Sequence, residues 1–215
     1  MEDVLSFVNE IRPYLEVLYF VAGVVVACAA VFALKQISIL KRTLHVQSKR
    51  DALKITSEQC ENYFSNIIDL KNQFFKKVKE HNIEYFNGWE VTVTNNVISV
   101  KHKSTPSIKG LDKLAEEFRV LNSIESFSSF FVSNLADEQV AYDTVGMTFL
   151  RFNRELMPWI LSCNEKGHYN NLTTLFVKWE TRRMNDELQR QKLYLDEKIK
   201  QASFKSDVPL GAENR

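Results

Sequence analysis

The chain has 215 residues, in which 28 lysine and arginine residues are balanced by 27 aspartate and glutamate residues. This balance lacks the basic excess that marks a nucleic-acid-binding domain, and the length allows one domain with a short appended segment. With 6 glycine and 4 proline residues, the composition favours long helices over a turn-rich β fold. We therefore expect a mainly helical protein that binds no nucleic acid.

The most distinctive segment is an uninterrupted apolar run from Val17 to Leu34. A helix of this length measures about 27 Å, close to the thickness of the hydrocarbon core of a bilayer. The charged residues of segment 1–16, before the run, are mostly acidic, whereas those that directly follow the run are cationic. Cationic residues next to a span remain preferentially on the cytoplasmic side. We interpret residues 17–35 as a transmembrane helix of the inner (plasma) membrane, with a short extracytoplasmic tail before it and a cytoplasmic domain after it.

Three other interpretations of the apolar run are open. A cleaved signal peptide has a basic start and a shorter apolar core, whereas this start is acidic. The sequence Val25-Val26-Ala27-Cys28 loosely fits a lipidation site at Cys28, although the apolar run continues past this cysteine. A buried core helix usually carries a polar face, which this run lacks. The transmembrane interpretation is therefore favoured.

Two sets of residues in and after the span point to contacts in the membrane. Small residues four apart let two spans pack closely, which makes Gly23 and Ala27 a candidate packing face. Segment 36–58 is expected to continue the span as a polar stalk helix. Cations at its start and along it are placed to contact anionic lipid head groups: Lys35, Lys41, Arg42, Lys49 and Arg50.

The pattern after the stalk predicts a helical domain over residues 59–202, interrupted by a β-hairpin at 89–100. From Cys60, apolar residues recur at steps of three and four, which predicts an amphipathic helix that ends near His81. The hairpin follows from two β-branched runs on either side of an asparagine turn. Because two strands alone are marginally stable, we expect the hairpin to pack on the helices or to pair with another chain. Residues 101–110 are expected to form a loop.

Three further helices are predicted. The first covers 111–135, with a core face that includes Ala115 and Phe118. The second begins at Asp137-Glu138 and is kinked or ended by Pro158. The third covers 172–202 and has an apolar first half and a charged second half, in which a few apolar residues lie near heptad spacing: Met184, Leu188, Leu195 and Ile199. The spaced segment is short for an independent coiled coil, and residues 203–215 are expected to be a flexible tail.

The sequence contains no phosphate loop, dinucleotide turn, zinc motif or nucleophile elbow, and we expect neither a cofactor nor a metal. The most unusual acid is Glu125, which falls with Asn122 on or near the apolar face of helix 111–135. A buried carboxylate requires a hydrogen-bonding or charged partner. We interpret this pair as a candidate buried polar site, either functional or a contact that fixes helix packing, with Arg151 and Arg154 as candidate partners.

Segments of the predicted second half resemble the bacterial and phage DUF4760 family. They read V-L-N-S-I-E-S-F at 120–127, A-D-E-Q-V-A-Y-D at 136–143 and L-R-F-N-R-E-L-M-P-W-I at 150–160, followed by Trp179-Glu180. The resemblance covers about residues 115–182. It implies a membrane-anchored helical protein of a bacterial inner membrane and supplies no catalytic residues. The hairpin at 89–100 departs from the family pattern and is interpreted as an insertion.

Together these patterns predict a single-pass, membrane-anchored, cytosolic helical interaction protein. It would be non-enzymatic, would contact membrane lipid, and would bind a protein partner or form a homo-oligomer. An alternative is a membrane-acting anti-phage or stress effector that is triggered by clustering of its transmembrane helix. A third hypothesis is an enzyme with a non-standard site at Asn122 and Glu125.

Overall fold

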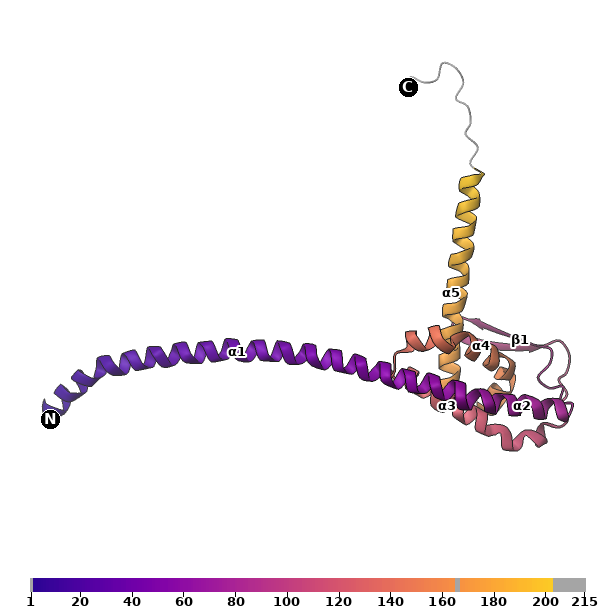
Figure 1. The fold of residues 1–215 in the computed structure, drawn as a ribbon, viewed down its shortest axis with the longest axis horizontal. Coiled ribbons are helices and arrows are strands. Elements are labelled where there is room, and N and C mark those ends of the chain that lie inside the picture. Colours follow the sequence, from indigo (N-terminus) through magenta and orange to yellow (C-terminus); the bar gives the residue numbers. More distant parts are fainter. Residues whose placement is uncertain (1, 165–166, 203–215) are drawn as a thin grey trace, which may run out of the picture. The chain divides into compact units, whose positions relative to one another are not determined.

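The computed structural model describes residues 2–164 and 167–202 (Figure 1). The fold is mainly helical with one two-stranded hairpin, as predicted. The chain divides into two compact units, of which the first ends at Ala52 and the second begins at Leu53. The tail predicted at 203–215 lies outside the described residues.

Helix α1 (Glu2–Asn62) is continuous and contains both the predicted span and the predicted stalk. It is long and apolar enough to cross a membrane, and none of its most apolar window is buried. The last part of the predicted stalk already belongs to the second unit, because Ile55 packs against the core and Thr56 is buried. The Thr56 Oγ1 accepts a hydrogen bond of 2.7 Å from the backbone N–H of Asp137.

The amphipathic helix predicted from Cys60 onward is present, with a local departure from α geometry. A π-helical turn (η1, Tyr63–Ile67) joins α1 to α2 (Ile68–Glu80). The sequence period did not predict this turn. Tyr63 and Ile67 are both buried there, and the Tyr63 ring lies 5.1 Å from the ring of Phe127. The wider turn therefore brings both of its terminal side chains to the core.

The predicted hairpin consists of β1 (Trp89–Thr94) and β2 (Val97–His102). Asn95 and Asn96 form its turn with φ of 51° and 63°, the left-handed conformation of a two-residue turn that asparagine tolerates. Strand β2 is longer than predicted, because Lys101 and His102 pair with β1 and do not belong to the loop. The β1 strand packs on α4 and α5.

The helix predicted over 111–135 begins as a 3-10 helix (η2, Leu111–Glu117), and only α3 (Phe118–Val132) is α-helical. Ala115, which the sequence analysis placed on the core face, is exposed. The reason is geometric: at three residues per turn, Leu111 and Leu114 share one side and Ala115 is turned away from it. The side chain of Phe118 lies outside the described part of the structure.

Helix α4 (Glu138–Cys163) begins where predicted, and the side chain of its N-cap Asp137 accepts a hydrogen bond of 3.1 Å from the N–H of Val140. Pro158 lies inside the helix and does not end it. Proline removes one backbone hydrogen bond and crowds the preceding turn, and burial of Met157, Pro158 and Trp159 offsets that cost.

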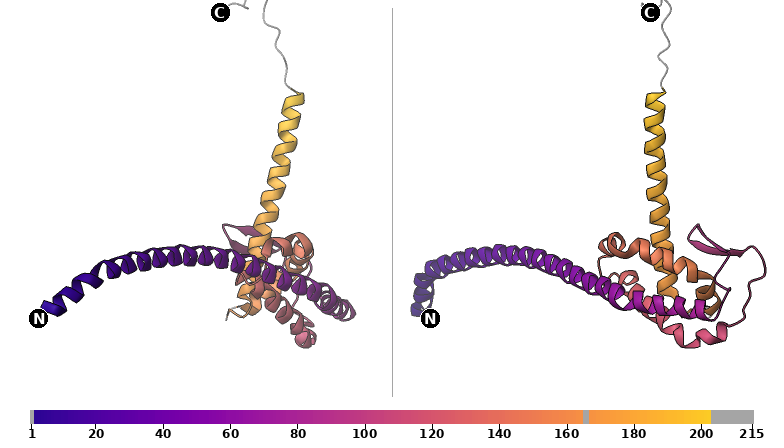
Figure 2. Two further views of the ribbon diagram at one scale, coloured as in Figure 1. Left: turned by 60° about the vertical axis from the view of Figure 1, so that its left-hand side comes forward. Right: turned by 45° about the vertical axis from the view of Figure 1, so that its right-hand side comes forward.

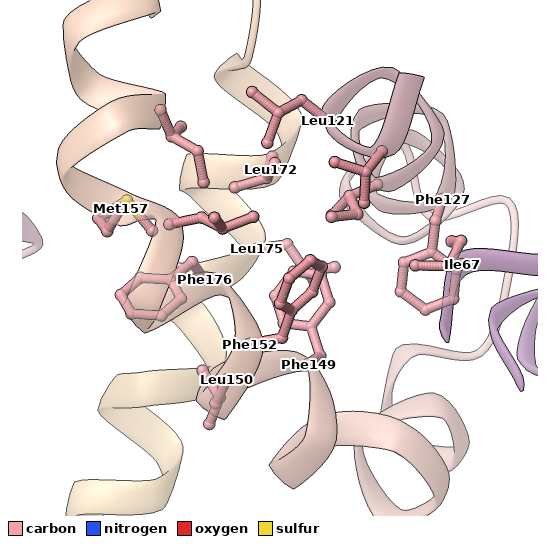
Figure 3. Close-up of a cluster of buried hydrophobic side chains, with 14 of the residues drawn as sticks. Ile67, Leu121, Phe127, Phe149, Leu150, Phe152, Met157, Leu172, Leu175 and Phe176 are labelled. Carbon is pink, nitrogen blue, oxygen red and sulfur yellow. The ribbon is translucent and has the colours of Figure 1, made fainter. Parts of the chain in front are cut away.

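Helix α5 (Asn170–Gln201) packs its first half on α3 and α4. The second half extends beyond the other elements of this unit, as the yellow ribbon shows (Figure 1, Figure 2). Figure 3 shows the centre of the core between these helices, and its side chains come mainly from α3, α4 and α5. The first half of α5, predicted to be apolar, contributes four residues to the core: Leu172, Leu175, Phe176 and Trp179.

Candidate interaction surface

The residues predicted to lie in or near the membrane are all exposed on α1. This holds for Gly23 and Ala27, and a Cβ atom added at Gly23 would have open space around it. The five cations after the span are also exposed: Lys35, Lys41, Arg42, Lys49 and Arg50. The structure therefore leaves both sets accessible and brings neither into a site within the described residues.

Glu125, the acid singled out in the sequence, holds the start of α5. Its Oε1 accepts hydrogen bonds from the backbone N–H and side-chain amide of Asn171, at 3.1 and 2.8 Å, and its Oε2 accepts one from the N–H of Leu172 at 2.8 Å. A carboxylate at a helix N-terminus satisfies otherwise unpaired N–H groups and interacts favourably with the helix dipole. The prediction of a buried polar pair is wrong for Asn122, which is exposed, whereas Glu125 is half-buried. Asn122 Oδ1 accepts a hydrogen bond of 3.4 Å from the Tyr169 hydroxyl.

The prediction that Arg151 or Arg154 pairs with Glu125 is wrong. Arg151 is exposed, and Arg154 forms an ion pair with Glu180 on α5. Both arginines lie on α4, and Arg154 pairs with a residue of α5 rather than with one of α3. What the sequence could not show is that the backbone at the start of α5, rather than a charge, satisfies Glu125.

Glu138 and Glu180 are carboxylates of the second unit that join α4 to α5. Glu138, in the first turn of α4, accepts hydrogen bonds from the indole N–H of Trp179 at 2.5 Å and from Arg182 at 2.8 Å, and lies 2.9 Å from the Nζ of Lys178. Burial raises the pKa of Glu138, but the hydrogen bonds from Lys178, Arg182 and Trp179 outweigh it and leave the pKa below its ordinary value.

The pKa of Glu180, on α5, is set by the same opposition between burial and neighbouring cations. It is buried and binds Arg154 of α4 and Arg183 of its own helix. Burial raises the pKa of Glu180, and the contacts with Arg183 and Arg154 lower it to a net value below the ordinary one. Both carboxylates are ionised and saturated by cations, so they act as latches between α4 and α5 and are poorly suited to proton transfer.

Beyond these latches, α5 carries an exposed apolar stripe. Met184, Leu188, Leu195 and Ile199 are 39%, 60%, 56% and 67% exposed. At 100° per residue the four side chains lie within an arc of about 60°. We call these residues the α5 stripe. They are the ones that the sequence identified by their near-heptad spacing, and the structure shows that no described element covers them.

A groove flanks the first half of the α5 stripe. It has a volume of about 430 Å³, and its walls are β1 from Val91 to Thr94 and the face of α5 that carries Met184 and Leu188. Val93 is buried and Val91 is half-buried beside it, so the floor is apolar, while charged groups stand at the rim. A second, larger cavity of about 650 Å³ lies on the other side of the hairpin, between β2, the end of α4 and the first half of α5.

We find no candidate metal centre in the part of the chain that the structure describes. There, no group of three or more histidine, cysteine, aspartate or glutamate residues could hold a metal ion. His102 has a local structural role, since its Nε2 lies 2.8 Å from the backbone oxygen of Asn87 and its ring lies 4.8 Å from that of Trp89. It ties the open end of the hairpin to the preceding loop.

Comparisons of the chain with family models, curated proteins and solved structures found no match. Membership of the DUF4760 family therefore stays a prediction. The segments on which that resemblance rests do meet in space, because Glu138 binds Trp179 and Arg154 binds Glu180. These contacts join α4 to α5.

Proposed function

We propose that this chain is a single-pass membrane protein whose helical domain is a non-enzymatic interaction module in the cytoplasm. Residues 17–35 would form the span, with the N-terminus outside. The observation that carries the proposal is the combination of a helical core closed by the contacts of Glu138 and Glu180 with an exposed α5 stripe that takes no part in that core. An apolar surface of this kind on a folded domain marks an interaction site.

The membrane part of the proposal is supported by the exposure of the apolar half of α1. Its large side chains there are more than half exposed, as Leu18, Phe20, Val24 and Phe32 illustrate. None of the described residues buries this apolar window, and lipid is the medium in which its side chains are stable. The exposed cations after it, Lys35 to Arg50, support the cytoplasmic side and contact with anionic head groups.

The anchoring step can be tested on the full-length protein in its host. We expect the protein to remain in the membrane pellet after alkaline carbonate extraction. An external protease should leave the C-terminal domain intact in sealed cells and digest it after permeabilisation. Release by carbonate, or digestion in sealed cells, would overturn the membrane part of the proposal.

The interaction step can be tested with a pair of matched substitutions. Leu195→Glu places a charge in the α5 stripe, and Leu193→Glu places the same charge on the opposite side of the same helix, where Leu193 is 65% exposed. With an amine-reactive crosslinker in membranes, the wild type and Leu193→Glu should form adducts, and Leu195→Glu should lose them. Equal adduct formation in all three proteins would show that the stripe is not the interaction surface.

A further inference from the structure

The proposed interaction module leaves open which molecule covers the α5 stripe, and the structure favours a second copy of the same chain. The apolar residues are symmetric about a point between Gln191 and Lys192. Met184 and Ile199 are equally far from this point, and so are Leu188 and Leu195. Two such helices in antiparallel orientation would therefore bring Met184 opposite Ile199 and Leu188 opposite Leu195, twice over by symmetry.

One pair of opposite charges beside the stripe fits the same arrangement, although Glu187 also lies 2.9 Å from Arg183 of its own helix. Glu187 and Lys198 lie on the same flank of the stripe, roughly 20° apart at 100° per residue. In an antiparallel pair a flank faces the same flank of the other copy. Glu187 of one copy then comes within about two residues, or 3 Å along the axis, of Lys198 of the other. The arrangement forms this pair twice.

The hairpin argues against the parallel arrangement. Strand β1 flanks the side of α5 on which Met184 and Leu188 lie. In a parallel pair the two hairpins would both be directed into the narrow space between the helices, since packed helices lie only about 8–10 Å apart. In the antiparallel pair the groove beside β1 meets only the last turns of the other copy's α5, with Ile199 entering the apolar floor near Val91 and Val93.

We propose that the α5 helices of two copies pair in antiparallel orientation through the α5 stripe, with the end of each helix seated in the β1 groove of the other copy. This inference rests on the proposed interaction module and names its partner. The stripe covers fewer than three heptads and would be weak as an isolated pair. Tethering of both copies in one membrane raises their effective concentration and compensates for the short contact.

Disulfide formation between introduced cysteines tests the orientation in the full-length protein in membranes. The background replaces exposed Cys28 and partly exposed Cys163 by alanine and keeps the buried Cys60. Co-expressed Leu188→Cys and Leu195→Cys chains should form a mixed disulfide, while neither variant should form one alone. The reason is that the two Leu188 positions would lie about 10 Å apart along the axis, beyond the reach of a disulfide.

Two further cysteines complete the test. Gln191→Cys lies next to the symmetry point and should link to itself, and Leu193→Cys on the opposite side should not link. A disulfide in Leu188→Cys alone would show a parallel pair and overturn the inference. Absence of any disulfide at Gln191→Cys would overturn self-pairing altogether. If the crosslinked adducts of the preceding section nevertheless contain a different protein, the interaction module survives and only its assignment to a second copy fails.

A charge exchange gives an independent readout. Glu187→Lys and Lys198→Glu should each lower the yield of the mixed disulfide about two- to fivefold, as expected for exposed ion pairs. The double variant should restore the yield. A parallel pair would place Lys198 away from Glu187, so failure of the double variant to rescue would count against the antiparallel register.

Discussion

Glu125 on α3 caps the first turn of α5, with its Oε2 2.8 Å from the backbone nitrogen of Leu172. The residues that it joins are far apart in the chain, so the cap fixes where α5 starts on the surface of α3. A side chain that looked like a buried reactive acid in the sequence is therefore a positioning group for a helix.

Replacement of Glu125 should lower the stability of the domain, because the role of this side chain is structural. We expect Glu125→Ala to lower the free energy of unfolding by about 1–2 kcal/mol, because a cap is lost and two backbone N–H groups lose their acceptor. Thermal unfolding of the full-length protein in detergent measures this change. Glu155→Gln, an exposed substitution on α4, is the control and should leave the melting temperature unchanged. An unaltered melting temperature in Glu125→Ala would reopen the hypothesis of a functional acid at this position.

The carboxylate latches predict that the domain loses stability in acid. The pKa values of Glu138 and Glu180 lie below the ordinary value of 4.5, so the unfolded chain takes up these protons more readily than the folded one. The stabilisation is fully present above pH 4.5 and is lost as the pH falls through the lowered values. Unfolding measured between pH 7 and pH 3 should show this loss.

The same experiment with Glu138→Gln isolates one latch. This variant should be less stable than the wild type at pH 7, because Arg182 and Lys178 lose their counter-charge, and its stability should depend less on pH. Asp143→Asn, which changes an exposed acid on the same helix, should retain the wild-type slope. If Glu138→Gln kept the full slope, the acid sensitivity would have to be assigned to other groups.

Much of this fold follows from periodicity, and the exceptions have identifiable causes. Alternation and an asparagine pair were enough for the hairpin, and three- and four-residue steps were enough for α2, α4 and α5. The π turn at Tyr63 and the 3-10 start at Leu111 were not predictable, because both change the number of residues per turn without changing which residue types are buried. Lys101 and His102 were assigned to the loop that contains Pro106, whereas in the structure Lys101 pairs with Glu90 and His102 with Trp89.

Of the candidate interaction surface, the sequence predicted the α5 stripe but not the contacts of Glu138 and Glu180. The α5 stripe was visible in the sequence because its apolar residues recur at regular spacing among charged residues. The latches of Glu138 and Glu180 were not identified. Their partners Trp179, Arg182 and Arg154 lie on other turns or another helix, and single-sequence patterns contain no information about contacts between helices. The sequence analysis noted these residues only as the acidic first turn at Glu138, which has a purely local explanation, and within the segments of the DUF4760 resemblance.

Asn153 is a buried polar residue whose replacement by an apolar one should stabilise the domain. It is fully buried; its Nδ2 donates to the backbone oxygen of Phe149 at 2.8 Å, but its Oδ1 has no hydrogen-bond partner among the described residues. We expect Asn153→Leu, which keeps the branching at Cγ, to raise the free energy of unfolding by about 1 kcal/mol. Asn185→Leu on the exposed face of α5 controls for helix propensity and should give a smaller gain. A loss of stability in Asn153→Leu would mean that the site cannot accommodate the larger side chain.

The hairpin turn offers a second test of backbone geometry. Asn96 has a φ of 63°, which glycine adopts freely and β-branched residues adopt at a cost. Asn96→Gly should preserve or slightly raise the melting temperature, and Asn96→Val should lower stability by about 1–2 kcal/mol. Thr92→Val, in the middle of β1 and exposed, should be tolerated because valine suits a strand. Equal effects of glycine and valine at position 96 would contradict the assigned turn.

Copies of this protein could associate at two places, the α5 stripe and the candidate span, and substitutions in the span distinguish them. Gly23 and Ala27 offer a small-residue face in the candidate span, and a leucine at both positions would prevent close approach of two spans there. If pairing depends on the α5 stripe, Gly23→Leu with Ala27→Leu should leave the mixed disulfide between Leu188→Cys and Leu195→Cys at its full yield. Val21→Leu with Val25→Leu, also four residues apart on the same helix, is the matched control. A loss of the disulfide in the Gly23 and Ala27 variant alone would move the decisive contact into the membrane, and it would favour an effector that acts through clustering of its span.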